Sequence, residues 1–161
     1  MFKNLKIGVR LGIGFGLVIV LLLVVSTVSY LRVNQLNTDI EVMVNDRFPK
    51  TVQANEMIDA INAIARQLRN SYIYSGEERK KALDAIAPQR KIISDNIEKL
   101  DKSITLDKGK EILKTVHAAR GAYVGSQDKF LALLAEEKKD EIVVLMQGDL
   151  RRTQGEYMKA I

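Results

Sequence analysis

The distribution of hydrophobic residues divides the chain into an uninterrupted apolar segment near the N-terminus and a longer region with helical periodicity. The apolar segment, residues 11–31, has no charged residue and reads LGIGFGLVIVLLLVVSTVSYL. At 1.5 Å per residue, these 21 residues form a helix of roughly 31 Å, the thickness of a bilayer's hydrocarbon core. The pattern therefore predicts a transmembrane helix over residues 11–31.

Beyond the apolar segment, apolar residues recur at alternating intervals of three and four, and we see no strand-like alternation. We predict that the first helix continues out of the membrane, is kinked or interrupted near Phe48 by Pro49, and stops at Ser75-Gly76. A second helix follows over residues 77–104, with a bend at Pro88. The third covers residues 110–136, and the fourth begins near residue 139.

Each predicted helix has one apolar stripe. The stripes are Ile58, Ile61, Ala65, Leu68 and Tyr72; Leu83, Ile86, Ile93, Ile97, Leu100 and Ile104; Leu113, Val116, Tyr123, Phe130 and Leu134; and Val143, Met146, Leu150, Tyr157 and Ala160. This spacing is typical of the seam of a left-handed helical bundle, and short connections make neighbouring helices antiparallel. The predicted fold is all-α, with an N-terminal transmembrane helix that continues into an antiparallel up-down four-helix bundle.

Charge around the apolar segment predicts its orientation. Lys3, Lys6 and Arg10 precede it with no acidic residue, so the N-terminus is expected in the cytoplasm. We expect residues 1–10 to be a cytoplasmic basic flank and residues 32–161 to lie outside the inner membrane. A cleaved signal peptide is the alternative. The apolar run is longer than a signal peptide's, and residues 26–29 make a poor cleavage site, so a retained anchor is favoured.

The fourth helix is shorter than its neighbours, so we expect the bundle to be C-terminally incomplete here. The segment that follows would complete the descent toward the membrane and supply a second span.

Composition argues against several kinds of function. The net charge of +5 owes three units to the N-terminal flank, which argues against a nucleic-acid surface. The sequence has no cysteine, so it offers no thiol nucleophile and no disulfide framework. Its one histidine, His117, has no second histidine or neighbouring nucleophile, and we expect it to be a surface or packing residue. We therefore expect no enzyme, no catalytic or metal site and no cofactor.

Polar residues interrupt the seams where an apolar residue is expected, and the interruptions lie at similar heights. Counted from the membrane-distal turns, polar groups of all four helices fall within a band of roughly 15 Å. The candidate ligand-binding residues in this band are Arg66, Arg69, Arg90, Arg120, Tyr123, Gln127 and Thr153.

A small carboxylate would satisfy these arginines. Buried charge requires a partner, and no acidic residue occupies a seam position in the band, since Asp95 and Glu98 fall on the exposed side. A guanidinium binds a carboxylate through two parallel hydrogen bonds. The alternative interpretation is that the arginines extend outward to solvent or pair with acids of a partner chain at a dimer interface.

Four stretches resemble one known family. FKNLKIGVRLGIGFGLVIVLLLVV, NDRFPK, NEMIDAINAIARQLRNSYI and LRRTQGEYMKAI are similar to bacterial methyl-accepting chemotaxis proteins with a four-helix-bundle sensor domain. The resemblance implies a homodimer in the bacterial inner membrane, with residues 32–161 as its periplasmic four-helix-bundle sensor domain. It also implies a following segment with a second span, a HAMP relay and a cytoplasmic coiled coil that engages the chemotaxis kinase complex. In this family, arginines of the first and third bundle helices hold small carboxylates with a tyrosine and a hydroxyl. Arg66, Arg120, Tyr123 and Thr153 occupy matching places.

The predicted function is therefore a transmembrane chemoreceptor whose periplasmic bundle senses a small anionic solute such as an organic acid or amino acid. Two alternatives remain open at this stage. In the first alternative the chain is the sensor region of a histidine kinase or diguanylate cyclase. In the second it is a structural or relay bundle that binds no ligand.

Overall fold

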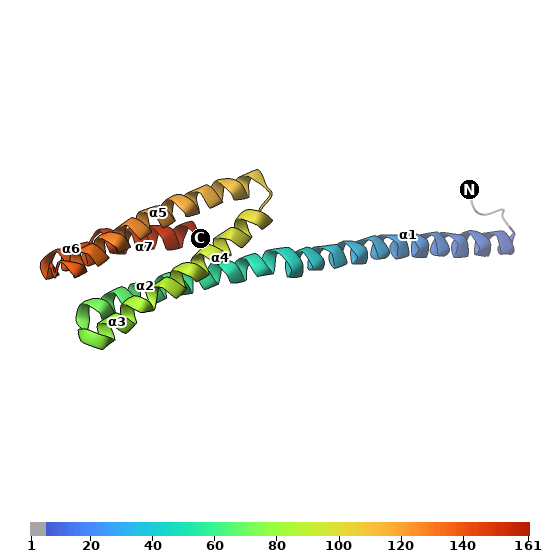
Figure 1. Cartoon of the computed structure of the whole chain (residues 1–161). Coiled ribbons are helices and arrows are strands. Elements are labelled where there is room, and N and C mark those ends of the chain that lie inside the picture. The colour runs from blue at the N-terminus through green and yellow to red at the C-terminus, as the bar shows by residue number, and fades with distance from the viewer. Residues whose placement is uncertain (1–5) are drawn as a thin grey trace. The chain divides into compact units, whose positions relative to one another are not determined.

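The computed structural model describes residues 6–161, and this part of the chain consists of helices and connecting turns with no strand (Figure 1). Lys3 of the predicted basic flank lies outside the described residues. The chain divides into two compact units, which meet between Pro49 and Lys50. The predicted all-α class is confirmed.

The first unit is dominated by α1, Ile7–Val42, which includes the whole predicted transmembrane segment. None of its residues is buried within the protein, and the leucines of the segment are more than half exposed. Such a large apolar surface is unfavourable in water. By length and composition this helix is able to cross a membrane.

The interruption predicted at Pro49 is present as a wider turn of helix. Residues Met43–Arg47 form a π-helical turn, η1, before α2 begins at Phe48. Pro49 has no N–H to donate to the carbonyl of Asn45, so the regular hydrogen-bond ladder cannot continue through this point. The chain nevertheless stays helical from Ile7 to Ile73.

The second unit contains the four predicted bundle helices, two of which are broken into shorter elements. They are α2, Phe48–Ile73; α3, Gly76–Asp84, with α4, Ile86–Ser103; α5, Asp107–Ala135; and α6, Lys139–Gln147, with α7, Asp149–Ala160. Helix α5 packs along α6 and α7 (Figure 1). The predicted stop after α2 is correct, and Gly76 adopts a φ of 57° there, which suits glycine.

Two breaks interrupt the bundle helices. The first is at Ala85, between α3 and α4, one turn before Pro88. Pro88 cannot donate to the carbonyl of Asp84, which is the reason for the bend predicted from the sequence. The second, at Gly148 between α6 and α7, was not predicted.

The bundle core confirms the predicted stripe of the third helix, and that of the second from Ile86 to Leu100. In the second helix Leu83 and Ile104 are half-buried, and Ala82 is buried instead of Leu83.

The stripes of the first and fourth helices are corrected. In α2 the buried stripe is Met57, Ile61, Ile64, Leu68 and Ser71, whereas Ile58, Ala65 and Tyr72 are half-buried. Two adjacent stripes of α2 both have three-four spacing, and the fold buries the one that contains Ile64 because a larger side chain removes more apolar surface from water than Ala65 does.

The fourth helix differs in its first half. Ile142 and Leu145 are buried, while the predicted core residue Val143 is 36% exposed. The break at Gly148 shifts the helical phase, so a stripe extrapolated backward from Leu150 and Tyr157 falls one residue too late.

Candidate functional site

The four bundle helices enclose a cavity of about 180 Å³, which we call the central cavity. Its lining comes from α2, α4, α5 and α7, and the residues are Ile64, Arg90, Ile93, Arg120, Tyr123, Val124, Gln127 and Tyr157. Four residues of the predicted polar band therefore line one cavity inside the second unit: Arg90, Arg120, Tyr123 and Gln127.

Arg90 of α4 connects the interior of the bundle with its surface. Its Nε donates to Oε1 of the buried Gln127 at 2.9 Å, and its Nη2 lies 2.8 Å from Oδ1 of Asp128. The Arg90 side chain is 33% exposed, and that of Asp128 is 58% exposed. Arg90 thus partly matches the alternative in which the arginine extends outward, because an acid of the same chain already pairs with it.

Arg120 of α5 is held by a neutral group. Its Nη2 donates to Ser94 Oγ of α4 at 2.6 Å, and within the described part of the chain it makes no ion pair. Its charge is therefore balanced by no acidic side chain here. A half-buried guanidinium without an anion favours an external one.

The two tyrosines that line the cavity carry unpartnered hydroxyls. Tyr123 and Tyr157 are each 1% exposed, and their ring centroids lie 6.2 Å apart with an interplanar angle of 44°. Within the described part of the chain neither hydroxyl makes a hydrogen bond of good geometry, although the Gln127 amide lies close enough to the Tyr123 hydroxyl to lower its pKa. Leaving a buried polar group unpaired costs about 1–3 kcal/mol, so an acceptor bound in the cavity would gain both hydroxyls as donors.

Both tyrosines remain protonated donors at neutral pH. Burial raises the pKa of Tyr157 to about 12, although the nearby Arg120 charge opposes the shift. Burial also raises the pKa of Tyr123 well above its usual range, with Arg90 and then Gln127 acting in the opposite direction. Neutral hydroxyls can donate to a carboxylate, whereas tyrosinates would repel it.

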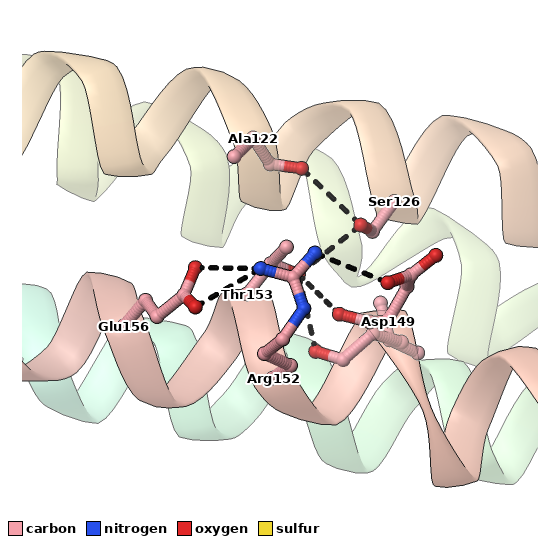
Figure 2. Close-up of polar contacts among 7 residues, drawn as sticks. Ala122, Ser126, Asp149, Arg152, Thr153 and Glu156 are labelled. Carbon is pink, nitrogen blue, oxygen red and sulfur yellow. Dashed lines mark hydrogen bonds and ion pairs between the residues drawn. The ribbon is translucent and has the colours of Figure 1, made fainter.

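Thr153, another predicted site residue, is buried beside the cavity but does not line it. Its hydroxyl donates to the Asp149 carbonyl at 2.8 Å and lies 3.1 Å from Ser126 Oγ of α5 (Figure 2). Ser126 in turn lies 3.2 Å from the Ala122 carbonyl. Thr153 therefore links α7 to α5 behind Tyr157.

The neighbouring Arg152 is exposed and pairs with Asp149 and Glu156 on the outer face of α7 (Figure 2). This charge network is separate from the cavity.

Arg66 and Arg69 are exposed on α2 and do not line the cavity. The inward face of α2 at this height carries Ile64 and Leu68 instead, as follows from the corrected stripe. The structure thus separates these two candidates from the other arginines.

Sequence reasoning missed two residues of the site. Tyr157 was counted as an apolar core residue, although its hydroxyl in a band of polar groups was a usable signal. Asp128 follows Gln127 directly and faces solvent, and no periodicity indicates that it meets Arg90 across helices.

The remaining titratable clusters lie at the surface. His117 pairs with Asp101 at 3.0 Å, and both side chains are more than 40% exposed, so the predicted surface position of His117 is correct. Within residues 6–161, no three histidine, cysteine or acidic side chains are placed to hold a metal ion.

Residues 4–161 match the family described as the four helix bundle sensory module for signal transduction, and the chain belongs to this family. No curated protein and no solved structure matches the chain. The resemblance drawn from the sequence motifs is therefore confirmed at the level of the sensor module.

Proposed function

We propose that this chain is the sensor region of a transmembrane chemoreceptor that binds a small organic anion in the central cavity. The observation that carries the proposal is the convergence of two arginines and two buried tyrosines on the lining of one cavity inside a sensory bundle, with no partner of good geometry for either tyrosine hydroxyl in the described chain.

The chemistry of the cavity suits a carboxylate. Arg120 supplies a positive charge that no acid of the described chain balances, and Tyr123 and Tyr157 supply neutral donors. Hydrogen bonds in which one partner is charged are about twice as strong as neutral ones. The apolar side chains of Ile64 and Ile93 exclude water, which strengthens these interactions further.

The proposed setting follows from the apolar span of α1 and from the family. We propose that the chain acts as a homodimer in a bacterial inner membrane, with its bundle in the periplasm. Its signal would pass through the following segment to a cytoplasmic chemotaxis kinase complex. A ligand that touches α2, α4, α5 and α7 at once can favour one arrangement of these helices, and shifts of about 1–2 Å are sufficient for switching.

Calorimetric titration of the full chain in lipid nanodiscs with short organic acids and amino acids tests the proposal. For an anion that binds, Arg120→Ala should weaken binding by more than about 100-fold, because removing one partner of a buried ion pair costs 3–5 kcal/mol. Arg151→Ala, which removes an exposed arginine of α7, is the matched control and should leave affinity unchanged.

The same titration, carried out with a variant of Arg66, tests whether the ligand binds on the outer face of α2 instead. Arg66→Ala should not weaken binding if the ligand sits in the central cavity. If Arg66→Ala abolishes binding and Arg120→Ala does not, the ligand site is on the outer face of α2 and the cavity proposal is wrong.

A ligand-free relay bundle is the second candidate, and the internal pairing of Arg90 with Asp128 favours it. In that case no compound of the panel binds, and Arg120→Ala changes only stability.

A further inference from the structure

Resting on the proposed function, we infer that the central cavity selects a monocarboxylate with an apolar body and discriminates against amino acids and dicarboxylates. Three independent features of the cavity lead to this ligand class. Its lining contains no acidic residue, only one of its two arginines lacks an anionic partner, and the other lining side chains are mostly apolar.

The lining offers no anionic group that would pair with an ammonium group. None of the cavity-lining residues is an aspartate or glutamate, and two of them are arginines. The Gln127 amide oxygen already accepts from Arg90. An amino acid would therefore place its ammonium beside positive charges with only the neutral tyrosine hydroxyl oxygens as acceptors, and burying a charge without an opposite charge is strongly unfavourable.

The charges around the cavity balance with one bound carboxylate. Arg90 is paired with Asp128 at 2.8 Å, so its charge is already compensated on the outer side. Arg120 is bound by the neutral hydroxyl of Ser94. One carboxylate neutralises Arg120, whereas a second would have to replace Asp128 as the partner of Arg90 or stay unpaired.

The rest of the cavity is apolar and of limited size. Ile64, Ile93 and Val124 line it together with the rings of Tyr123 and Tyr157. A volume of about 180 Å³ corresponds to about six water molecules, so a ligand of roughly six to ten heavy atoms fits. Each methylene that leaves water adds up to about fourfold to affinity, so a hydrocarbon body is favoured.

Three acids with the same six-carbon skeleton separate these features. Hexanoate has one carboxylate, norleucine adds an ammonium group at the second carbon, and adipate adds a second carboxylate. Titrated into the full chain in nanodiscs at pH 7, hexanoate should bind at least 10-fold more tightly than either of the others. Arg120→Ala should remove hexanoate binding, which locates it in the cavity.

The outcomes distinguish the inference from the proposed function. If norleucine or adipate binds as tightly as hexanoate or more tightly, and Arg120→Ala removes that binding, the ligand class is wrong while the proposed function stands. If none of these acids and no member of the wider panel binds, the proposed function fails, and the inference fails with it.

A variant of Asp128 tests the charge balance directly. Asp128→Asn keeps the size of the side chain but releases the charge of Arg90, so adipate should gain at least fivefold in affinity relative to hexanoate. Asp140→Asn, an exposed acid at the start of α6, is the control and should leave the ratio unchanged. An unchanged ratio in Asp128→Asn would overturn the assignment of Arg90 as already compensated.

Discussion

At the scale of single residues, the two buried tyrosines combine a structural cost with a function. A phenol that packs its ring in the core normally directs its hydroxyl to a partner, and neither Tyr123 nor Tyr157 does so here. Both hydroxyls belong to side chains that line the central cavity, so their partner is expected to be a ligand.

Replacing Tyr157 by phenylalanine keeps the ring and removes the hydroxyl. We expect Tyr157→Phe to weaken carboxylate binding by at least 10-fold, because a hydrogen bond to a charged group contributes about 1.5–3 kcal/mol. The stability without ligand should hold or rise, since an unpaired buried hydroxyl is removed. Titration calorimetry and urea unfolding measure the two quantities. Tyr74→Phe, at a 47% exposed tyrosine, should change neither.

The same hydroxyl predicts how stability depends on alkaline pH. A free tyrosine has a pKa near 10, whereas burial raises the pKa of Tyr157 to about 12. Below pH 10 the residue is neutral in both folded and unfolded chains, and its contribution is complete. Between pH 10 and 12 the unfolded chain loses the proton first, so stability falls as pH rises.

Urea unfolding followed by circular dichroism between pH 8 and pH 12 measures this effect. Tyr157→Phe should show a shallower loss of stability above pH 10 than the unmodified chain. Equal slopes would mean that the hydroxyl of Tyr157 ionises as easily in the bundle as in the unfolded chain.

The residues that could be predicted for the site are those in the seams. Arg90, Arg120, Tyr123 and Gln127 share a stripe with apolar residues, so periodicity alone directs them inward, and the structure places all of them around the cavity. Arg66 and Arg69 lie off the buried stripe of α2, and a count of residues along a helix gives height but not facing direction. Thr153 faces inward as its seam position implies, but its hydroxyl is taken by the backbone.

At the scale of helices, the elements were predictable because the three-four pattern is regular and Ser75-Gly76 marks the end of α2. The errors arose where two adjacent stripes are equally apolar, as in α2, or where a glycine changes the phase within a helix, as at Gly148. To choose the buried stripe in these two helices, one must know how much surface the neighbouring helices cover, and the sequence pattern does not contain that information.

Gly109 is expected to be required for the connection between α4 and α5. A Cβ at Gly109 would lie 2.5 Å from Cγ2 of Ile104, the C-cap residue that follows α4. Because Cγ2 of a β-branched side chain cannot move away freely, Gly109→Ala should destabilise the bundle by about 1–3 kcal/mol. Chemical unfolding measures the change.

Gly125→Ala in the middle of α5 is the matched control, since a Cβ there meets nothing within 4 Å. Alanine forms helix better than glycine, so this substitution should stabilise by up to about 1 kcal/mol. A similar effect of both substitutions would contradict the close approach at Gly109.

At the scale of the whole molecule, one apolar helix and one bundle define how the chain would be placed at a membrane. With a single span and a basic N-terminal flank, we expect the N-terminus inside and the bundle outside the inner membrane. A reporter that is active only in the periplasm, fused after Ile161, should be active. The same reporter inserted after Arg10 should be inactive. The reverse result would invert the proposed topology.

The position of Arg90, half inside the bundle and half in solvent, also bears on how quickly such a sensor can follow its surroundings. A partly exposed ion pair like that with Asp128 contributes only about 1 kcal/mol, so it is closed in most molecules but opens and re-forms often. Exposed side chains change rotamer within nanoseconds. If a ligand passes Arg90 on its way in and out, this side chain adds no delay, and occupancy of the cavity tracks the present concentration rather than a past one.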